Sequence, residues 1–174
     1  MREIHEFSFP EQFIAGTVGL PGERTFYLQA IDGRRNVAVA LEKSQLSILA
    51  GRIIGLLKEI KFGKAQDFRR NGRRLPSLVT PFVEEFRVGA LSLTWNPQTQ
   101  HLIVEAQSGD ESEIVDDPNE GPALLKVTIS VESALAFAID SLALIGAGRP
   151  PCPFCGSPLD SQGHLCPRAN GYRR

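Results

Sequence analysis

The chain has 174 residues, of which 42% are hydrophobic and 22% are charged, and its formal net charge is −1. These values are ordinary for a globular protein, and the length suffices for one good-sized domain or for a domain with a small appendage. A chain so close to neutral is not a simple polyanion binder, and no apolar run approaches the roughly 20 residues that a membrane-spanning helix requires. The charged start, Met1 to Glu6, is not typical of a targeting peptide, so we expect a cytoplasmic protein without membrane insertion.

β-branched and aromatic residues between Gly and Pro turns predict strands in the first part of the chain. We expect these strands over residues 4–9, 13–18, 25–31 and 36–41. A helix then begins near Ser44, a suitable N-cap. Its apolar residues repeat with the spacing of one helical face: Leu46, Leu49, Ala50, Ile53, Leu57 and Ile60.

The second part of the chain repeats this pattern. Strands are expected over residues 86–95, 101–106 and 124–129, and a helix begins near Ser130 with the apolar residues Leu135, Ala138, Ile139, Leu142 and Ile145. A shift of 89 residues superimposes the apolar residues of the two helices, starting with Leu46 on Leu135. The strand openings correspond at another offset, with Phe13 and Gly16 matching Phe86 and Gly89.

The sequence therefore predicts an α+β fold made of two tandem βββα units. We expect the units, residues 1–60 and 82–148, to pair around a pseudo-twofold axis and build one antiparallel sheet with both helices on one face. Neither unit is long enough to bury a sheet face and a helix by itself, so residues 1–148 form one domain with an internal basic linker, residues 61–81. The alternative is that two sheet-and-helix units resemble each other by chance.

The near-zero net charge hides segments of opposite charge. The basic linker holds Lys61, Lys64, Arg69, Arg70, Arg73 and Arg74 against the single anion Asp67. Residues 105–120 hold seven carboxylates and no Lys or Arg, and residues 149–174 are basic again. Such segments form solvated faces, pair within one chain, or meet between subunits.

The C-terminal segment, residues 149–174, holds all three cysteines of the chain and one histidine. Zinc prefers thiolate sulfur and imidazole nitrogen, and structural zinc sites fill four positions with them. The C-x2-C pair is followed by a glycine, which permits the tight turn of a zinc knuckle, and the H-x-C pair points to one side of an extended segment. We therefore predict a structural Zn²⁺ site of the zinc-ribbon type, with the ligands Cys152, Cys155, His164 and Cys166.

Other uses of these cysteines fit the segment less well. A disulfide would leave one odd thiol, and nothing at the N-terminus points to an oxidising compartment. Redox C-x2-C motifs open a helix after a strand, whereas this pair follows Pro150-Pro151 and contains Pro153. A catalytic zinc keeps one position open, which four clustered ligands do not favour unless His164 binds weakly.

Several segments resemble an uncharacterised bacterial protein family. They are residues 13–19 (FIAGTVG), 24–30 (RTFYLQA), 39–43 (VALEK), 150–156 (PPCPFCG) and 166–174 (CPRANGYRR). The resemblance covers nearly the full length, and the family, found mainly in actinobacteria, is a conserved family of unknown function. It implies a bacterial cytoplasmic protein and no particular activity.

Two non-enzymatic functions remain open. The first is an interaction or assembly module, in which zinc holds a small terminal subdomain and the charged segments meet a protein partner or a second copy. The second is single-stranded RNA or DNA binding, because the tandem units are similar in topology to Pur-alpha and Whirly proteins. Phosphate contacts and base stacking would then come from Arg69, Arg70, Arg73, Arg74, Arg168, Tyr172, Arg173 and Arg174. The acidic segment opposes this second hypothesis.

An enzyme is the third hypothesis, and the sequence favours it least. It contains no glycine-rich phosphate loop, no nucleophile elbow and no H-E-x-x-H motif. His5 and His101 look isolated, and Glu42 and Glu105 are typical of solvated carboxylates at strand ends. We therefore favour the interaction module.

Overall fold

The computed structural model of the chain describes residues 1–20, 22–68, 74–109, 119–147 and 153–155. The strands in these ranges are β1 (Ile4–Ser8), β2 (Gln12–Val18), β3 (Thr25–Asp32), β4 (Arg35–Leu41), β5 (Glu84–Asn96), β6 (His101–Ser108) and β7 (Leu124–Ser130). The helices are α1 (Lys43–Glu59), the short 3-10 helix η1 (Ala65–Phe68) and α2 (Val131–Gly146). The seven predicted strands and the starts of the two predicted helices are thus confirmed to within two residues. No helix in the described ranges is long and apolar enough to cross a membrane.

The seven strands form one mixed sheet in the order β1-β7-β6-β5-β4-β3-β2. β2, β3 and β4 form one antiparallel meander, and β5, β6 and β7 form another. The prediction of a purely antiparallel sheet was wrong at two junctions, because β4 pairs with β5 in parallel and β1 pairs with β7 in parallel. The connection from β4 to β5 runs through α1, and a crossover of this kind brings the chain back to join a parallel strand.

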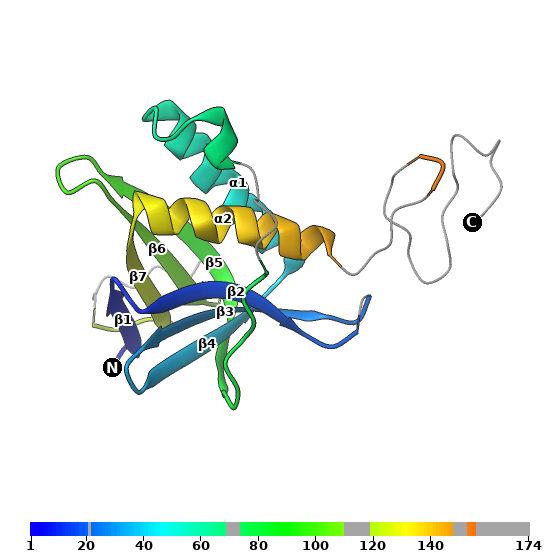
Figure 1. Ribbon diagram of the computed structural model, residues 1–174. Coiled ribbons are helices and arrows are strands. Elements are labelled where there is room, and N and C mark those ends of the chain that lie inside the picture. The colour runs from blue at the N-terminus through cyan, green and yellow to red at the C-terminus, as the bar shows by residue number, and fades with distance from the viewer. Residues whose placement is uncertain (21, 69–73, 110–118, 148–152, 156–174) are drawn as a thin grey trace.

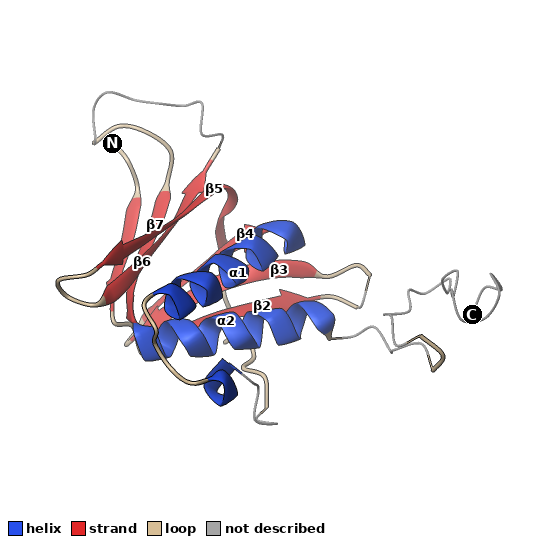
Figure 2. Cartoon of the chain, turned by 90° about the horizontal axis from the view of Figure 1, so that it is seen from above, coloured by secondary structure: helices blue, strands red, loops and turns tan. Residues whose placement is uncertain are grey.

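Both helices cover the same, concave face of the sheet, which curls around them (Figures 1 and 2). α1 and α2 pack against each other, α2 also contacts β2, β6 and β7, and α1 contacts β5. Corresponding strands of the two meanders run in the same direction. The expected pseudo-twofold axis stays a prediction, because rotation about an axis along the strands of a curled sheet keeps these directions.

The curl of the sheet brings β1 close to β4, although three strands separate them in the sheet order. Arg35 at the start of β4 donates from Nη2 to the Glu6 carbonyl oxygen of β1 at 2.7 Å. The Arg35 guanidinium also lies 4.0 Å from the centroid of the Phe7 ring, and Phe7 is buried. Arg35 thus covers part of the free edge of β1, which protects an edge strand from pairing with other chains.

Four of the five buried residues of α1 fall on buried residues of α2 at an offset of 88 residues. α1 buries Leu46, Leu49, Ala50, Ile53 and Leu57, and α2 buries Ala134, Phe137, Ala138, Ile139, Ser141 and Leu144. The predicted offset of 89 was wrong by one residue, because Leu142 is 39% exposed. Phe137 is buried in its place and stacks on Phe13 of β2, with 4.6 Å between the ring centroids. α2 is apolar on more than one face, so its hydrophobic pattern does not predict which face turns toward the core.

The N-caps of the helices stand at the same offset of 88 residues, Glu42 for α1 and Ser130 for α2. The main-chain N–H of Glu42 donates to Gln45 Oε1 at 2.8 Å, as in a capping box. The prediction that Ser44 caps α1 was therefore wrong. Ser130 is confirmed as a cap, because the Ser133 N–H donates to its Oγ at 3.2 Å.

Residues 75–83, the crossover segment, traverse the outer, convex face of the β2–β3 hairpin on the way to β5. Gln29 of β3 is fully buried and holds this segment by both ends of its amide. The Val79 N–H donates to Gln29 Oε1 at 2.8 Å, and Gln29 Nε2 donates to the Val79 carbonyl oxygen at 2.9 Å. Gly16 of β2 makes room for the segment, because a Cβ there would collide with the Leu78 side chain.

The crossover segment ends beside Tyr27, whose ring packs edge-on against Phe82 with 5.0 Å between the centroids. The Tyr27 hydroxyl donates to Glu84 Oε2 at 3.3 Å. Burial, followed by the charge and hydrogen bond of Glu84, raises the pKa of Tyr27 above its ordinary value of 10.0, while Arg87 acts in the opposite direction. The protonated phenol is therefore the form that the fold favours.

Candidate functional site

The predicted zinc ligands lie mostly outside the described residues. Cys155 is described, within residues 153–155, and its side chain is half-buried. Cys152, His164 and Cys166 lie outside the described ranges. The zinc site therefore stays a prediction from the sequence.

The predicted nucleic-acid contacts are also mostly outside the described ranges. Arg74 is described and exposed, whereas Arg69, Arg70, Arg73, Arg168, Tyr172, Arg173 and Arg174 are not described. The structure thus places one of the eight residues, and the predicted nucleic-acid site stays a prediction from the sequence.

Both helices cover the concave face of the sheet, so a nucleic acid that binds to the sheet would meet the convex face of β1, β5, β6 and β7. Strand register places Glu6, Lys126, Glu105 and Ser92 in one row across it. Lys126 Nζ lies 3.7 Å from Glu6 Oε1, and Ser92 Oγ donates to Glu105 Oε2 at 3.1 Å. One cation among two carboxylates does not attract phosphates, so this row opposes binding of a nucleic acid.

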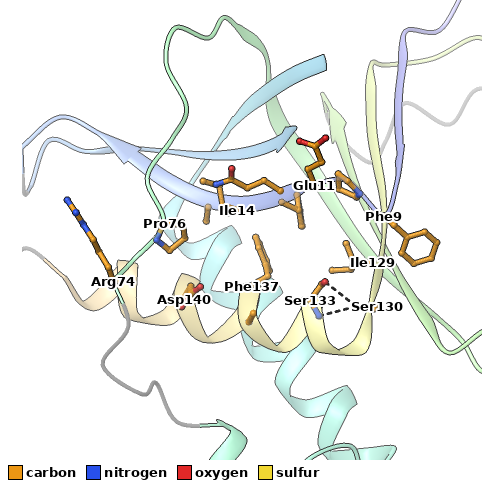
Figure 3. Close-up of a pocket in the computed structure, with 15 residues that line it drawn as sticks. Phe9, Glu11, Ile14, Arg74, Pro76, Ile129, Ser130, Ser133, Phe137 and Asp140 are labelled. Carbon is orange, nitrogen blue, oxygen red and sulfur yellow. Dashed lines mark hydrogen bonds between the residues drawn. The ribbon is translucent and has the colours of Figure 1, made fainter. Parts of the chain in front are cut away.

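A groove with a volume of about 530 Å³ lies at the edge strand β2. We call it the β2-edge groove. Its lining residues are Phe9, Pro10, Glu11, Gln12, Phe13, Ile14 and Ala15, then Arg74 and Pro76, then Ile129, Ser130, Ser133, Ala136, Phe137 and Asp140 (Figure 3). The volume is in the range of pockets that bind small molecules or parts of a peptide.

The main chain of β2 lies between two walls of this groove. Strand alternation turns Phe13 toward α2 and Ile14 toward the convex face, where Pro76 of the crossover segment also lines the groove. Figure 3 shows Phe137 pointing from α2 toward β2, with Arg74 and Pro76 at one end of the groove and Glu11 toward the other. The groove therefore presents a strand edge with an apolar side on each flank.

The two edges of the sheet differ. The edge of β1 is partly covered by Arg35, which donates to the Glu6 carbonyl oxygen. β2 is the other edge strand, and within the described residues no strand pairs with its outer side. An open strand edge offers main-chain donors and acceptors to another extended chain.

The groove is lined by apolar residues with a few polar and charged side chains. Glu11, Arg74 and Asp140 are its charged residues, and Ser130 and Ser133 bond to each other at the start of α2. No His, Cys or Lys is present among the described residues that line it. The two serines are engaged with each other at the N-terminus of the helix.

The carboxylates considered for an enzyme have structural partners. Glu42 caps α1 and accepts from Arg87 Nη1 at 3.0 Å, and Glu105 accepts from Ser92. His101 packs edge-on against Phe9, with 4.6 Å between the ring centroids.

A second, smaller cleft of about 310 Å³ lies beside the start of α1 and includes Arg24, Lys43 and Arg87. Arg24 Nη1 donates to the Leu144 carbonyl oxygen at 3.2 Å, and Arg87 is paired with Glu42. Two of its three cations are thus bound to neighbouring groups of the protein.

The prediction that His5 is isolated was wrong. The ligand atoms of His5, Glu3 and Glu85 all lie within 4.8 Å of one another. In the sequence, the spacing of Glu3 and His5 is the one signal for this cluster, because side chains two residues apart on a strand share a side. Glu85 comes from β5, and no local pattern connects it with β1.

Comparison with known protein families gives a match to DUF3090, a protein family of unknown function, over residues 5–166. The chain belongs to the DUF3090 family. The predicted resemblance to a family of unknown function is thereby confirmed. The match spans the residues of the β2-edge groove and the positions of the four predicted zinc ligands. No curated protein and no solved structure matches the chain.

Proposed function

We propose that this DUF3090 protein is a non-enzymatic interaction module that takes an extended segment of a protein partner onto the edge of β2. The observation that carries the proposal is the β2-edge groove, in which an open strand edge lies between two walls. Extended peptides bind in this way by adding a strand to a sheet. Main-chain hydrogen bonds supply affinity, and the flanking pockets select side chains.

The two walls define which peptide fits. Alternate side chains of an added strand would point toward α2, where they meet Ala136 and Phe137, or toward Ile14 and Pro76 on the convex side. Glu11 lies toward one end, and Arg74 and Asp140 lie at the other, so charged side chains of the partner belong at the ends of the segment. A partner segment with apolar residues in its middle and charges at its ends meets both conditions.

The C-terminal segment belongs to this proposal as a zinc knuckle. Cys152, Cys155, His164 and Cys166 have the donor types and spacing of a structural site. A metal stabilises a small segment that has little hydrophobic core. The segment follows α2, which ends at Gly146 and forms one wall of the groove.

The two halves of the domain are interpreted as tandem units within the same proposal. Their N-caps and their buried helix faces share the offset of 88 residues, and each half orders its elements as a meander followed by a helix. Two related units joined along one sheet leave one outer strand of the first unit, β2, at an edge.

The test uses a photo-crosslinking amino acid in place of Gln12, a half-buried residue of β2 that lines the groove. Its crosslinks are compared with those from position Gln98, an exposed turn residue outside the groove. Ala136→Arg places a long side chain into the groove from α2. Ala143→Arg is the matched control, because Ala143 is also half-buried on α2 and does not line the groove.

We expect position 12 to crosslink to one segment of a partner protein or of a second copy, identified by mass spectrometry. Ala136→Arg should abolish this crosslink, and Ala143→Arg should leave it. A crosslink that survives Ala136→Arg, or a pattern equal to that of position 98, would refute the proposal. Native mass spectrometry with and without a chelator reports the oligomeric state and the expected single zinc ion per chain, and absence of zinc would remove the zinc knuckle from the proposal.

A further inference from the structure

Three potential metal ligands converge where β1 begins, on the opposite edge of the sheet from the β2-edge groove. Glu3 and His5 are two residues apart on an extended segment, which places their side chains on one side. The main-chain carbonyl of Glu3 accepts from the Leu124 N–H at 2.9 Å, which fixes this segment against β7. Glu85, at the start of β5, supplies the third ligand, and the three ligand atoms lie within 4.8 Å of one another.

The imidazole of His5 adds a second, independent observation. Its Nε2 atom is buried and has no hydrogen-bond partner among the residues that the structure describes. Glu3 Oε1 lies 3.3 Å away, within ion-pair distance, but no hydrogen bond joins the two groups. Buried polar atoms in native proteins are almost always satisfied, and an orphan of this kind indicates a missing partner.

A metal ion is the partner that suits the surroundings of this nitrogen. We propose that Glu3, His5 and Glu85 bind a divalent first-row transition-metal ion. One imidazole and two carboxylates are ligands that such ions accept, and no thiolate is needed. Two ligands of one ion are at most about 4.2 Å apart when each lies about 2.1 Å from it, so small rotations of the glutamates bring all three into range.

Exposure and charge in the neighbourhood agree with this assignment. The side chain of Glu3 is 66% exposed and that of His5 is 17% exposed, so the ion would meet solvent on one side and protein on the other. Water would complete its coordination there. Arg35, the cation that β4 brings to this edge, already donates to the Glu6 carbonyl oxygen and covers Phe7.

The site differs from the predicted zinc knuckle in position and in donor type. Thiolates select Zn²⁺, whereas carboxylates suit Mn²⁺, so Mn²⁺ is the probe that separates the two sites. The full chain, first saturated with one equivalent of Zn²⁺, is titrated with Mn²⁺. The electron paramagnetic resonance signal of free Mn²⁺ reports how much ion is bound.

Glu85→Gln and His5→Ala are the test variants. Glu84→Gln is the matched control, because Glu84 is the neighbouring glutamate on β5 and its carboxylate bonds to Tyr27 on the convex face. Cys155→Ser, titrated without added Zn²⁺ so that no displaced zinc competes for the site, shows whether any Mn²⁺ binds to the C-terminal segment. Glu85 is exposed, so Glu85→Gln keeps the test valid even if His5→Ala unfolds the chain, and circular dichroism reports folding.

We expect one Mn²⁺ per chain, and a dissociation constant raised at least about tenfold by Glu85→Gln, since even second-shell changes weaken metal sites by about 10- to 100-fold. Glu84→Gln and Cys155→Ser should leave the constant unchanged. Mn²⁺ should also raise the melting temperature of the unmutated chain and not that of Glu85→Gln. No binding at millimolar Mn²⁺, equal binding by Glu85→Gln, or loss of binding in Cys155→Ser would overturn the assignment.

Discussion

Gln29→Ala tests how the crossover segment is held on the convex face. The substitution removes the two hydrogen bonds to the Val79 main chain and a third, from Gln29 Nε2 to Asn36 Oδ1 at 2.9 Å. Each such bond contributes about 0.5–1.5 kcal/mol. Val79 is 44% exposed, so its main-chain groups regain some bonds to water in the variant, which lowers the loss. We expect the free energy of unfolding to fall by about 2–3 kcal/mol.

Urea unfolding measures this loss through the fluorescence of Trp95, the single tryptophan of the chain, which lies half-buried in β5. For a chain of this length the same loss lowers the melting temperature by about 4–12 °C. Gln98→Ala is the matched control, because Gln98 is exposed in the turn between β5 and β6. Its effect should stay within about 0.5 kcal/mol.

The result also bears on the β2-edge groove, because Arg74 and Pro76 lie directly before the anchored part of the crossover segment. Loss of the anchor should speed cleavage by trypsin after Arg74. If Gln29→Ala unfolds within about 0.5 kcal/mol of the unmutated chain, the Gln29 amide does not hold the segment and the reasoning fails.

Three further predictions concern stability. Gly16→Ala should lower the free energy of unfolding by about 1–3 kcal/mol, because the added Cβ collides with Leu78. In the same urea assay, the double variant with Leu78→Ala should lose less stability than the sum of the two single losses. Additive losses would contradict the collision. Ser130→Ala should lower the free energy of unfolding by about 1 kcal/mol because it removes an N-cap, whereas Ser44→Ala should change it by about zero. Equal effects of the two substitutions in thermal unfolding would contradict the assigned caps. The raised pKa of Tyr27 means that its contribution is present below pH 10.0 and is lost as the pH rises through the higher folded-state value. Stability measured from about pH 9 to pH 11 should therefore fall less steeply in Tyr27→Phe, and an unchanged slope would contradict this.

Local patterns in the sequence were enough to place the elements. The β-branched and aromatic residues between two turns predicted β3 at residues 25–31, and the spacing of Leu46, Leu49 and Ile53 predicted α1 and its buried face. Both signals arise within one element, because strand and helix periods decide which side chains share a face. The cap at Ser130 was predicted for the same reason, since an N-cap acts on residues within one turn.

The same patterns predicted the wrong buried residues where a helix has apolar residues on more than one face. α2 carries apolar residues around much of its surface, so Leu142 looked as suitable for the core as Phe137. The stacking of Phe137 on Phe13 decides the rotation, and Phe13 is more than 120 residues away in sequence. Glu42 takes the cap position of α1 with contacts to Gln45 of the helix and to Arg87 of β5. The contact with Arg87 depends on the tertiary structure, so the local sequence did not indicate it.

The sequence by itself determined the seven strands, the two helices, the family and the donor types of the predicted zinc site. Only the tertiary structure decided the parallel pairing of β4 with β5, the β2-edge groove and the meeting of His5 with Glu85. Alternation specifies which face of a strand is apolar and does not specify its neighbour, which depends on how the crossover and the curl of the sheet are packed. Glu85 lies near His5 because the sheet bends around two helices. The residue pattern within β1 or β5 does not predict that bend.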